Sequence, residues 1–561
     1  MIKILKRNKH WIWVKTDRRI KNINFKVIEK GVYKIPLTPQ NLFDLGEQFP
    51  REPRFKELQA KEEKYLASIK QKMWGTAIKN LIHDEDKVLE LKEKLESKIE
   101  LLGDYYRHQI LTIYFGTIFP SAGLFIKMGL GKTYCAINVM KFRMFHSGVR
   151  RTWIITPKTL IPQWKKEIEK FFPELKNKIL PIYDLSQIRK KDLNTITANV
   201  VIVNYEKILK ILDRLNSVDM LILDESTLVK NYRAKRTKAM LYLADKVRFK
   251  LVLTGTPLMN NPDEVWSQYY IINPYAFNLS YYMFRKNFFY KPRHSINWRF
   301  MPEKSSYFKK IIYSQAIRFK HEEVPEYKGN KVIKYCPVSL NPKHREIYND
   351  TAMGIVDELQ KLKGYNITKG LPILGKLRQV TSGFIILNKK DEKGKVLSKV
   401  VRLPEKSNKI EYVCTLTKRA VAEGNNVVVA VNFVQTGFLL KEELEKMGIK
   451  TGIIYGEQSS QVKKENETAF KKGELNAIIA QLRTGGLGLD FKNANIVIFA
   501  EADYSPKVNE QAAYRVIRLV QEKKCFIFYV YTKDTIDEKI LFGTLKNKEQ
   551  LIDSIVETIK R

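Results

Sequence analysis

Short apolar runs alternate with helical stretches in the first half of the chain. The runs lie at 152–157, 199–206, 219–225 and 250–257, and β-branched and aliphatic residues dominate them. Near-continuous apolar runs of this kind are typical of buried parallel strands in a sheet that helices cover on both faces. The segment from about 104 to 257 therefore predicts an α/β lobe.

The same alternation returns after residue 407 and predicts a second α/β lobe. Its apolar runs lie at 426–433, 451–456, 477–482, 495–501 and 525–532. Because no repeat of solenoid period occurs, we expect the two lobes to share a fold and not a sequence.

The remaining segments have other patterns. Residues 1–50 show the alternation of apolar and polar positions that is typical of strands. Residues 54–100 are rich in Lys, Glu and Leu, with leucines at helical spacing. Residues 258–325 are rich in aromatic and basic residues. We therefore expect four parts, the first a small α+β accessory module that is a candidate for DNA binding. The parts are the N-terminal module 1–100, lobe 1 at 101–257, a helical protrusion and linker at 258–406, and lobe 2 at 407–561.

Charge points to an anionic partner. The 561 residues carry a net charge of +40, from 100 Lys and Arg against 60 Asp and Glu. Nucleic acid is the default partner of so basic a chain, although a solvated Lys-rich surface is the plainer alternative. No apolar run is long enough to span a membrane. The four cysteines are far apart without a CxxC pair, so neither structural zinc nor a disulfide framework is expected.

A glycine-rich loop at 128–133 predicts a phosphate site. Gly129 and Gly131 allow a tight turn whose backbone N–H groups face phosphate, at the start of a helix. Lys132 would bridge the β- and γ-phosphates, and the Thr133 hydroxyl would bind Mg²⁺. Ile126 stands where the full phosphate-loop pattern has a glycine.

A pair of carboxylates supplies the other half of such a site. Asp224 and Glu225 follow an apolar run. One carboxylate on the metal and one polarising the attacking water is the division that hydrolysis needs, so Asp224 would hold Mg²⁺ and Glu225 would act as base. The residues thus predict an ATP hydrolase with ATP and Mg²⁺ as cofactors.

Two further motifs each have a plainer alternative. Thr254 and Thr256 follow an apolar run and would sense the γ-phosphate, unless they only form a turn. Arg515 and Arg518 would share a helical face and stabilise charge on the transferred phosphoryl group, unless that face is merely solvated.

The order of the motifs resembles that of superfamily 2 helicase-type ATPases, in the Swi/Snf branch of DNA translocases. The matching segments are YYRHQ (105–109), MGLGKT (128–133), TPKTLIPQW (156–164), VNYE (203–206), LDES (223–226), LTGTPLMN (253–260), RTGGLGLD (483–490), QAAYRVIRLVQ (511–521) and TIDEKI (535–540). The resemblance covers about 104–541 and implies an α/β fold with two RecA-like parallel-sheet lobes in tandem and helical insertions.

The resemblance also implies roles for single residues, with Gln109 recognising adenine and Arg518 as the arginine finger. Nucleotide contacts would come from Arg107, Gln109, Met128, Gly129, Leu130, Gly131, Lys132, Thr133, Gly488 and Asp490. DNA contacts would come from Thr156, Lys158, Trp164, Asn204, Thr484 and Gly485, and coupling from Thr254, Thr256 and Gln511. Thr227 stands where the family usually has a histidine after Asp-Glu-x.

The expected function is an ATP-dependent DNA translocase or helicase that tracks along or remodels duplex, forked or branched DNA through its phosphate backbone. We expect a monomer in the cytoplasm of a bacterium or a phage-infected host. Its expected role is fork remodelling, DNA repair or recombination. The sequence does not indicate protein partners. Two alternatives stay open: an RNA-directed helicase, and an ATP-gated DNA clamp in a defence or restriction complex.

Overall fold

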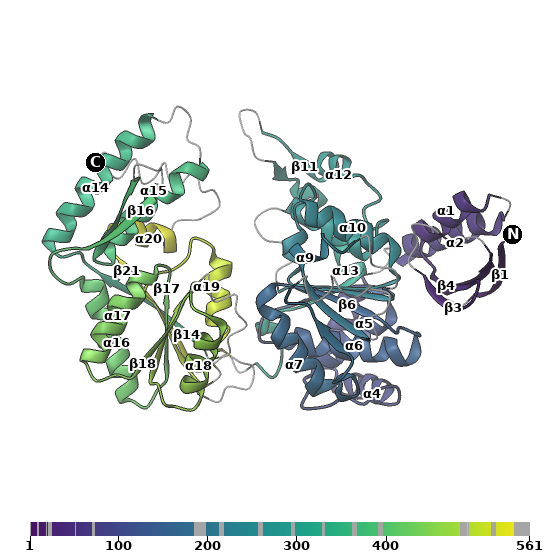
Figure 1. Cartoon of the computed structure of the whole chain (residues 1–561), viewed down its shortest axis with the longest axis horizontal. Helices are drawn as coiled ribbons and strands as arrows, with labels where there is room; N and C mark the ends of the chain where they lie inside the picture. Colours follow the sequence, from purple (N-terminus) through teal and green to yellow (C-terminus); the bar gives the residue numbers. More distant parts are fainter. Residues whose placement is uncertain are drawn as a thin grey trace. The chain divides into compact units, whose positions relative to one another are not determined.

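The chain divides into two compact units, residues 1–328 and 329–561 (Figure 1). The structure, a computed structural model, describes residues 2–7, 11–17, 20, 25–50, 52–69, 73–184, 198–212, 218–255, 262–292, 298–327, 331–361, 367–390, 396–482, 491, 493–517 and 523–542. Each unit is built around one large parallel sheet.

The sheet of the first unit has seven strands in the order β13-β5-β10-β9-β6-β8-β7, and all neighbours are parallel. The strands are β5 (Ser121–Ile126), β6 (Thr152–Thr156), β7 (Ile179–Pro181), β8 (Val200–Asn204), β9 (Met220–Leu223), β10 (Phe249–Leu253) and β13 (Ala316–Phe319). Every residue of β5, β6, β8, β9 and β10 is buried, as a sheet covered on both faces requires. The predicted first α/β lobe is confirmed.

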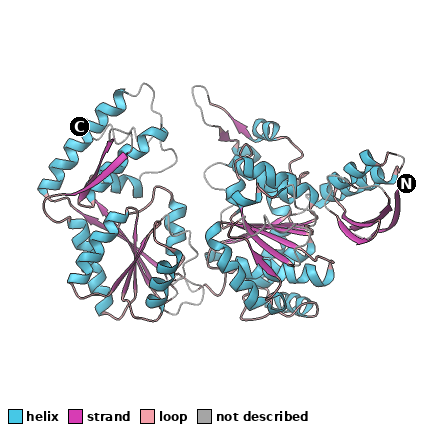
Figure 2. Cartoon of the chain, viewed as in Figure 1, coloured by secondary structure: helices cyan, strands magenta, loops and turns pink. Residues whose placement is uncertain are grey.

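Helices lie on both sides of this sheet (Figure 2). They include α5 (Arg107–Ile118), α6 (Lys132–His146), α7 (Ile161–Phe171), α9 (Tyr205–Ile208), α10 (Lys235–Lys246) and α11 (Val265–Ile272). Most residues of α5 and α6 are buried. A helix that is buried on most of its surface lies in the interior of a domain. Helix α6 begins directly after the glycine-rich loop, and α5 contacts that loop.

The second unit has a six-stranded parallel sheet in the order β14-β21-β20-β17-β19-β18. Its strands are β14 (Lys331–Val338), β17 (Val427–Val431), β18 (Thr451–Ile454), β19 (Ala477–Gln481), β20 (Ile496–Phe499) and β21 (Cys525–Thr532). Its helices include α14 (Pro342–Lys361), α15 (Ile367–Thr381), α16 (Asn408–Ala422), α17 (Val434–Lys446), α18 (Ser460–Lys471), α19 (Pro506–Ala513) and α20 (Ile536–Phe542), and β15 (Phe384–Lys390) pairs with β16 (Val396–Arg402). The two tandem RecA-like lobes are as predicted.

Two strands of the segment 258–406, predicted as a helical protrusion and linker, belong to the large sheets. Strand β13 extends the first sheet beside β5, and strand β14 extends the second sheet beside β21. The two compact units meet between residues 328 and 329. The sequence did not reveal β13, because this strand has only four residues and lies in an aromatic-rich segment without a clear alternation of apolar and polar residues. Its burial comes from pairing with β5.

The N-terminal residues form the small α+β module. Four antiparallel strands in the order β1-β2-β4-β3 pack with two helices. The elements are β1 (Ile2–Arg7), β2 (Trp11–Thr16), β3 (Lys26–Glu29), β4 (Val32–Pro36), α1 (Pro39–Gln48) and α2 (Arg54–Ile69). Helices α3 (Trp74–Lys79) and α4 (Glu85–Glu96) lead into α5. Among the helices of the described residues, none is both long and apolar enough to cross a membrane.

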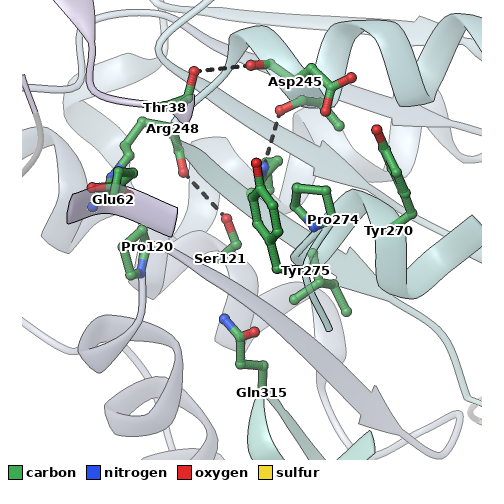
Figure 3. A pocket seen from close by; sticks show the side chains of 13 residues that line it. Thr38, Glu62, Pro120, Ser121, Asp245, Arg248, Tyr270, Pro274, Tyr275 and Gln315 are labelled. Atoms are coloured by element: carbon green, nitrogen blue, oxygen red, sulfur yellow. Dashed lines mark hydrogen bonds and ion pairs between the residues drawn. The ribbon is translucent and has the colours of Figure 1, made fainter. Parts of the chain in front are cut away.

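A polar junction joins this module to the lobe. The Thr38 hydroxyl donates to the Asp245 carbonyl at 3.0 Å, and the buried Arg248 guanidinium forms an ion pair with buried Glu62 (Figure 3). The pair borders a cavity of about 80 Å³. Burial raises the pKa of Glu62, and the charge of Arg248 opposes that rise.

Replacing Glu62 with Gln should destabilise the first unit. The change leaves the Arg248 charge buried without its counter-charge, which costs about 3–5 kcal/mol. Chemical denaturation followed by circular dichroism should show a lower unfolding midpoint. Glu57→Gln, at an exposed position on the same helix, is the control. Equal midpoints for the two variants would contradict a stabilising role of the pair.

Candidate active site

The glycine-rich loop connects β5 to α6 at the carboxyl edge of the first sheet. Gly129 and Gly131 both have φ +82°, a left-handed conformation that glycine adopts without strain. A Cβ on Gly131 would lie 2.2 Å from Nε2 of Gln109, so a side chain there would force Gln109 to move. Helix α6 begins at Lys132, and its first-turn N–H groups lack intrahelical partners. The local structure is that of an anion site at a helix N-terminus.

Side chains from two other segments bind the carbonyls of this loop. Nε2 of His321 donates to the Met128 carbonyl at 2.8 Å. Nε2 of His108 donates to the Leu130 carbonyl, also at 2.8 Å. Burial lowers the pKa of His108 to about 4, so the ring is neutral and donates through its single N–H. Sequence reasoning missed both histidines; His108 lies inside the quoted YYRHQ motif, whereas nothing in the sequence marks His321.

Gln109 and Arg107 lie near the loop but have partners within the lobe. Gln109 donates to the Leu130 carbonyl at 3.2 Å and accepts from the Tyr106 N–H at 3.1 Å. Arg107 forms ion pairs with Glu85 and Glu326. A hollow of about 330 Å³ is lined by Tyr105, Tyr106, Arg107 and Glu326, among others. Arg107 thus borders this hollow, whereas Gln109, the predicted adenine contact, is buried and is not among the lining residues.

The carboxylate of Asp224 lies just beyond β9 and is buried. Its Oδ2 accepts from the Thr156 hydroxyl at 3.0 Å and from the Trp164 indole N–H at 2.8 Å. Its Oδ1 accepts from the Glu225 N–H at 2.9 Å. Burial raises the pKa of Asp224, and the charge of Glu225 raises it further.

Thr156 and Trp164, two of the predicted DNA contacts, have buried side chains, and both donate hydrogen bonds to Asp224. Asn204 is also buried, and its Oδ1 accepts from the Lys207 N–H as the cap of α9. Of the four predicted DNA contacts in this unit, Lys158 alone has an exposed side chain.

Glu225 has φ +48° and ψ +51°, a left-handed conformation that is rare for a residue with a side chain. Such strain concentrates at functional sites, where the surrounding structure holds it. Its Oε1 lies 3.8 Å from Nζ of Lys132. A Cβ on Gly255 would lie 3.6 Å from the same Nζ, so the strand end that carries Thr254 also borders this point. The structure thus brings the predicted lysine, carboxylate and threonine segments together.

The residue after Glu225 anchors the turn. The Ser226 hydroxyl donates to Oε1 of Gln268 at 2.7 Å, and both side chains are fully buried. This bond ties the turn to α11. Thr227 stands where the resembled family usually has a histidine. The neighbouring Ser226 binds Gln268 and thereby holds the turn to the interior of the lobe.

The donor set suits Mg²⁺. Thr133 and Asp224 offer a hydroxyl and a carboxylate, and Mg²⁺ prefers such oxygen ligands together with water and substrate phosphates. The loop, Lys132 and Glu225 lie at the same edge of the sheet. The residues present therefore fit the predicted pairing of ATP with Mg²⁺.

In the second unit, Gln511 lies near the end of α19, which stops at Ala513. Arg515 lies in the turn that follows this helix and thus not on the helical face predicted for Arg515 and Arg518. Val516 N–H donates to the Ala513 carbonyl at 3.1 Å, which tightens the turn. The β-branched residues Val516 and Ile517, which are both buried, have a low helix propensity, consistent with the helix ending before them. The predicted residues outside the described part of the chain are Thr256, Thr484, Gly485, Gly488, Asp490 and Arg518.

Sequence reasoning also missed Glu501, a buried carboxylate near the end of β20. It accepts from the N–H groups of Asn432 and Phe433 at 2.7 and 2.9 Å and from the Thr436 hydroxyl at 2.7 Å. A carboxylate at the start of α17 complements the helix dipole. The sequence could have predicted Glu501 in the same way as Asp224, because each is an acidic residue directly after an apolar run.

Two family models match most of the chain. The SNF2-related domain matches residues 64–410, and the helicase conserved C-terminal domain matches residues 408–520. "Chromatin remodeling factor mit1" of Schizosaccharomyces pombe is 25% identical over 77% of this chain and 31% of its own length. "Putative ATP-dependent helicase/translocase YwqA" of Bacillus subtilis is 26% identical over 77% of this chain and 46% of its own length. The chain thus spans less than half of each relative.

Among solved structures, the "Sulfolobus solfataricus SWI2/SNF2 ATPase core in complex with dsDNA" has a TM-score of 0.37 and 22% identity, over 82% of this chain and 96% of that chain. The SNF2-related match spans more than half of the present sequence, and the helicase C-terminal match follows it. The chain therefore belongs to the SNF2-related family of helicase-type proteins.

Proposed function

We propose that this protein is an ATP-dependent DNA translocase, which couples ATP hydrolysis to tracking along or remodelling duplex DNA. The observation that carries the proposal is the convergence of Lys132, Asp224 and Glu225 beside the glycine-rich loop. Membership of the SNF2-related family supports the same reaction class.

Each residue of this site has a distinct task. Lys132 and the N-terminus of α6 would hold the β- and γ-phosphates. Thr133 and Asp224 would hold Mg²⁺, which supplies charge neutralisation on the phosphates when bound. Glu225 would polarise the attacking water, and its short distance from Lys132 keeps the base beside the phosphate site.

Thr156 would connect DNA contact to this chemistry without touching DNA itself. Its hydroxyl positions the Asp224 carboxylate, and Lys158 lies exposed two residues further along the chain. A phosphate that binds Lys158 would shift the end of β6 and thus the carboxylate.

The proposal also assigns roles to residues of the second unit. In the proposed mechanism, Arg515 and Arg518 stabilise charge on the transferred phosphoryl group, and Gly488 and Asp490 contact nucleotide. Thr484 and Gly485 would bind the DNA backbone, and Thr254, Thr256 and Gln511 would couple nucleotide state to the second lobe.

The proposed substrate is duplex, forked or branched DNA, which the protein binds as a monomer through phosphates. A net charge of +40 supports a polyanionic partner. The proposed role is fork remodelling, repair or recombination in the cytoplasm of a bacterium or phage-infected host. Relatives named "Uncharacterized ATP-dependent helicase" in Mycoplasma pneumoniae and "Putative ATP-dependent helicase/translocase YwqA" in Bacillus subtilis support a bacterial setting.

Duplex or forked DNA should stimulate steady-state ATP hydrolysis, and the stimulation should fall steeply with salt. Phosphate contacts release counterions, so affinity drops by roughly a thousandfold or more between low and moderate salt when about six phosphates are bound. The rate is measured without nucleic acid and with single-stranded DNA, blunt duplex, forked DNA and RNA. Preference for RNA would favour an RNA-directed helicase. Hydrolysis indifferent to every polymer would overturn the motor and favour an ATP-gated clamp.

Glu225→Gln should bind ATP normally and turn it over about a hundredfold more slowly, because the amide cannot accept a proton from water. Binding of a fluorescent ATP analogue and single-turnover hydrolysis measure the two effects. Lys132→Ala provides the contrast, since it should weaken nucleotide binding itself. Normal turnover in Glu225→Gln would remove this residue from the role of base.

Trp164→Phe should slow hydrolysis about tenfold with little change in ATP affinity. The variant deletes one hydrogen bond to the Asp224 carboxylate, and bonds to charged groups contribute about 1.5–3 kcal/mol. Trp266→Phe is the matched control, because that buried indole donates to the Leu279 carbonyl at 3.0 Å, away from the site. Equal rates in the two variants would contradict a positioning role for Trp164.

A further inference from the structure

A groove outside the ATP site is lined by residues of α12 (Tyr281–Phe288), of α13 (Ser305–Ser314) and of the segments that precede them. Figure 1 shows α12 beside β11 (Phe289–Tyr290), which pairs with β12 (Arg299–Phe300). The groove has a volume of about 330 Å³. The residues that matter for its chemistry are Asn278, Asn287, Phe288, Lys304 and Tyr307.

An aromatic ring at this groove is held in place and left open to solvent. Tyr307 is 54% exposed, and its ring lies parallel to that of buried Phe288, with an interplanar angle of 5° and a centroid distance of 6.1 Å. Phe288 in turn packs against Phe277, Phe284 and Phe308. The aromatic core beneath thus fixes the orientation of Tyr307, which makes the ring a preformed stacking surface.

Polar side chains that both donate and accept hydrogen bonds line the groove, and the edge of a nucleobase requires both. Asn278 and Asn287 both line it with exposed side chains. Nδ2 of Asn287 donates to the Met283 carbonyl at 2.9 Å, but a carboxamide has two donor hydrogens and an acceptor oxygen. Two carboxamides beside a stacking ring offer the donors and acceptors that recognise unstacked bases.

The charge around the groove favours a polyanion. The described exposed cations between 281 and 310 are Lys286, Lys291, Arg299, Lys304, Lys309 and Lys310, against one carboxylate, Glu303. Further exposed aromatic rings lie among them: Lys286 Nζ is 4.7 Å from the ring centroid of Tyr282, and Tyr290 is the cross-strand partner of Arg299. Cations interleaved with exposed rings suit single-stranded nucleic acid, whose bases stack and whose backbone tracks positive charge.

We propose that this groove binds an unpaired base of single-stranded nucleic acid, with Tyr307 stacking on the base, Asn278 and Asn287 at its edge, and Lys304 on the adjoining phosphate. An acidic protein segment would satisfy the charge but would not need the open ring. The proposal refines the proposed function, on which it rests for a nucleic-acid substrate, by giving the motor a second contact for DNA with an unpaired strand.

The test is nucleotide-free binding of the full chain to labelled oligothymidine and to a blunt duplex, followed by fluorescence anisotropy. Tyr307→Ala should weaken oligothymidine binding about tenfold, as expected for the loss of one stacked base. Tyr307→Phe should retain binding, since the ring remains. Duplex affinity and duplex-stimulated ATP hydrolysis should stay at the wild-type level in both variants, so failure of the groove and failure of the motor give different results.

Phe145→Ala is the matched control, because this ring on α6 is also 54% exposed. An oligothymidine loss in Tyr307→Ala no greater than in the control would overturn the proposal. A loss that affects duplex and oligothymidine alike would also overturn it, because the contact would then not select an unpaired base.

Discussion

The buried carboxylate of Asp224 is the constraint on which the first unit's site depends. An ion removed from water must be compensated by hydrogen bonds or it destabilises the fold. Here Thr156 at the end of β6 and Trp164 on α7 supply those bonds, while Oδ1 accepts from the next residue of the chain. Satisfying one carboxylate therefore fixes the relative positions of a strand end, a helix and the turn that carries Glu225.

Parallel strands bring such groups together because their carboxyl ends meet at one edge of the sheet. The glycine-rich loop follows β5, Asp224 follows β9, and Gly255 follows β10, although more than a hundred residues separate the first from the last. The second unit repeats this arrangement: Glu501 follows β20 closely and binds backbone N–H groups at the start of α17. In both units, an acidic side chain beyond a central strand holds neighbouring elements in place.

The sequence predicts the parts whose signal is local. Apolar runs mark the central strands, and Lys132, Asp224 and Glu225 follow from short motifs. It does not predict contacts that depend on distant segments: His321 reaches the loop from 193 positions away, and the hydrogen bonds of Thr156 and Trp164 to Asp224 span 68 and 60 positions. The edge strand β13 was missed because its burial comes from β5.

The same turn connects the site to the aromatic groove. Ser226 is bonded to Gln268 on α11, and residues 273–280 connect α11 to α12, which forms one wall of the groove. Breaking this buried hydrogen bond without replacing it would cost free energy. If the turn moves when nucleotide binds, α11 must therefore follow or lose that bond. If the groove binds a strand as we propose, α11 is the segment through which the turn could affect that strand.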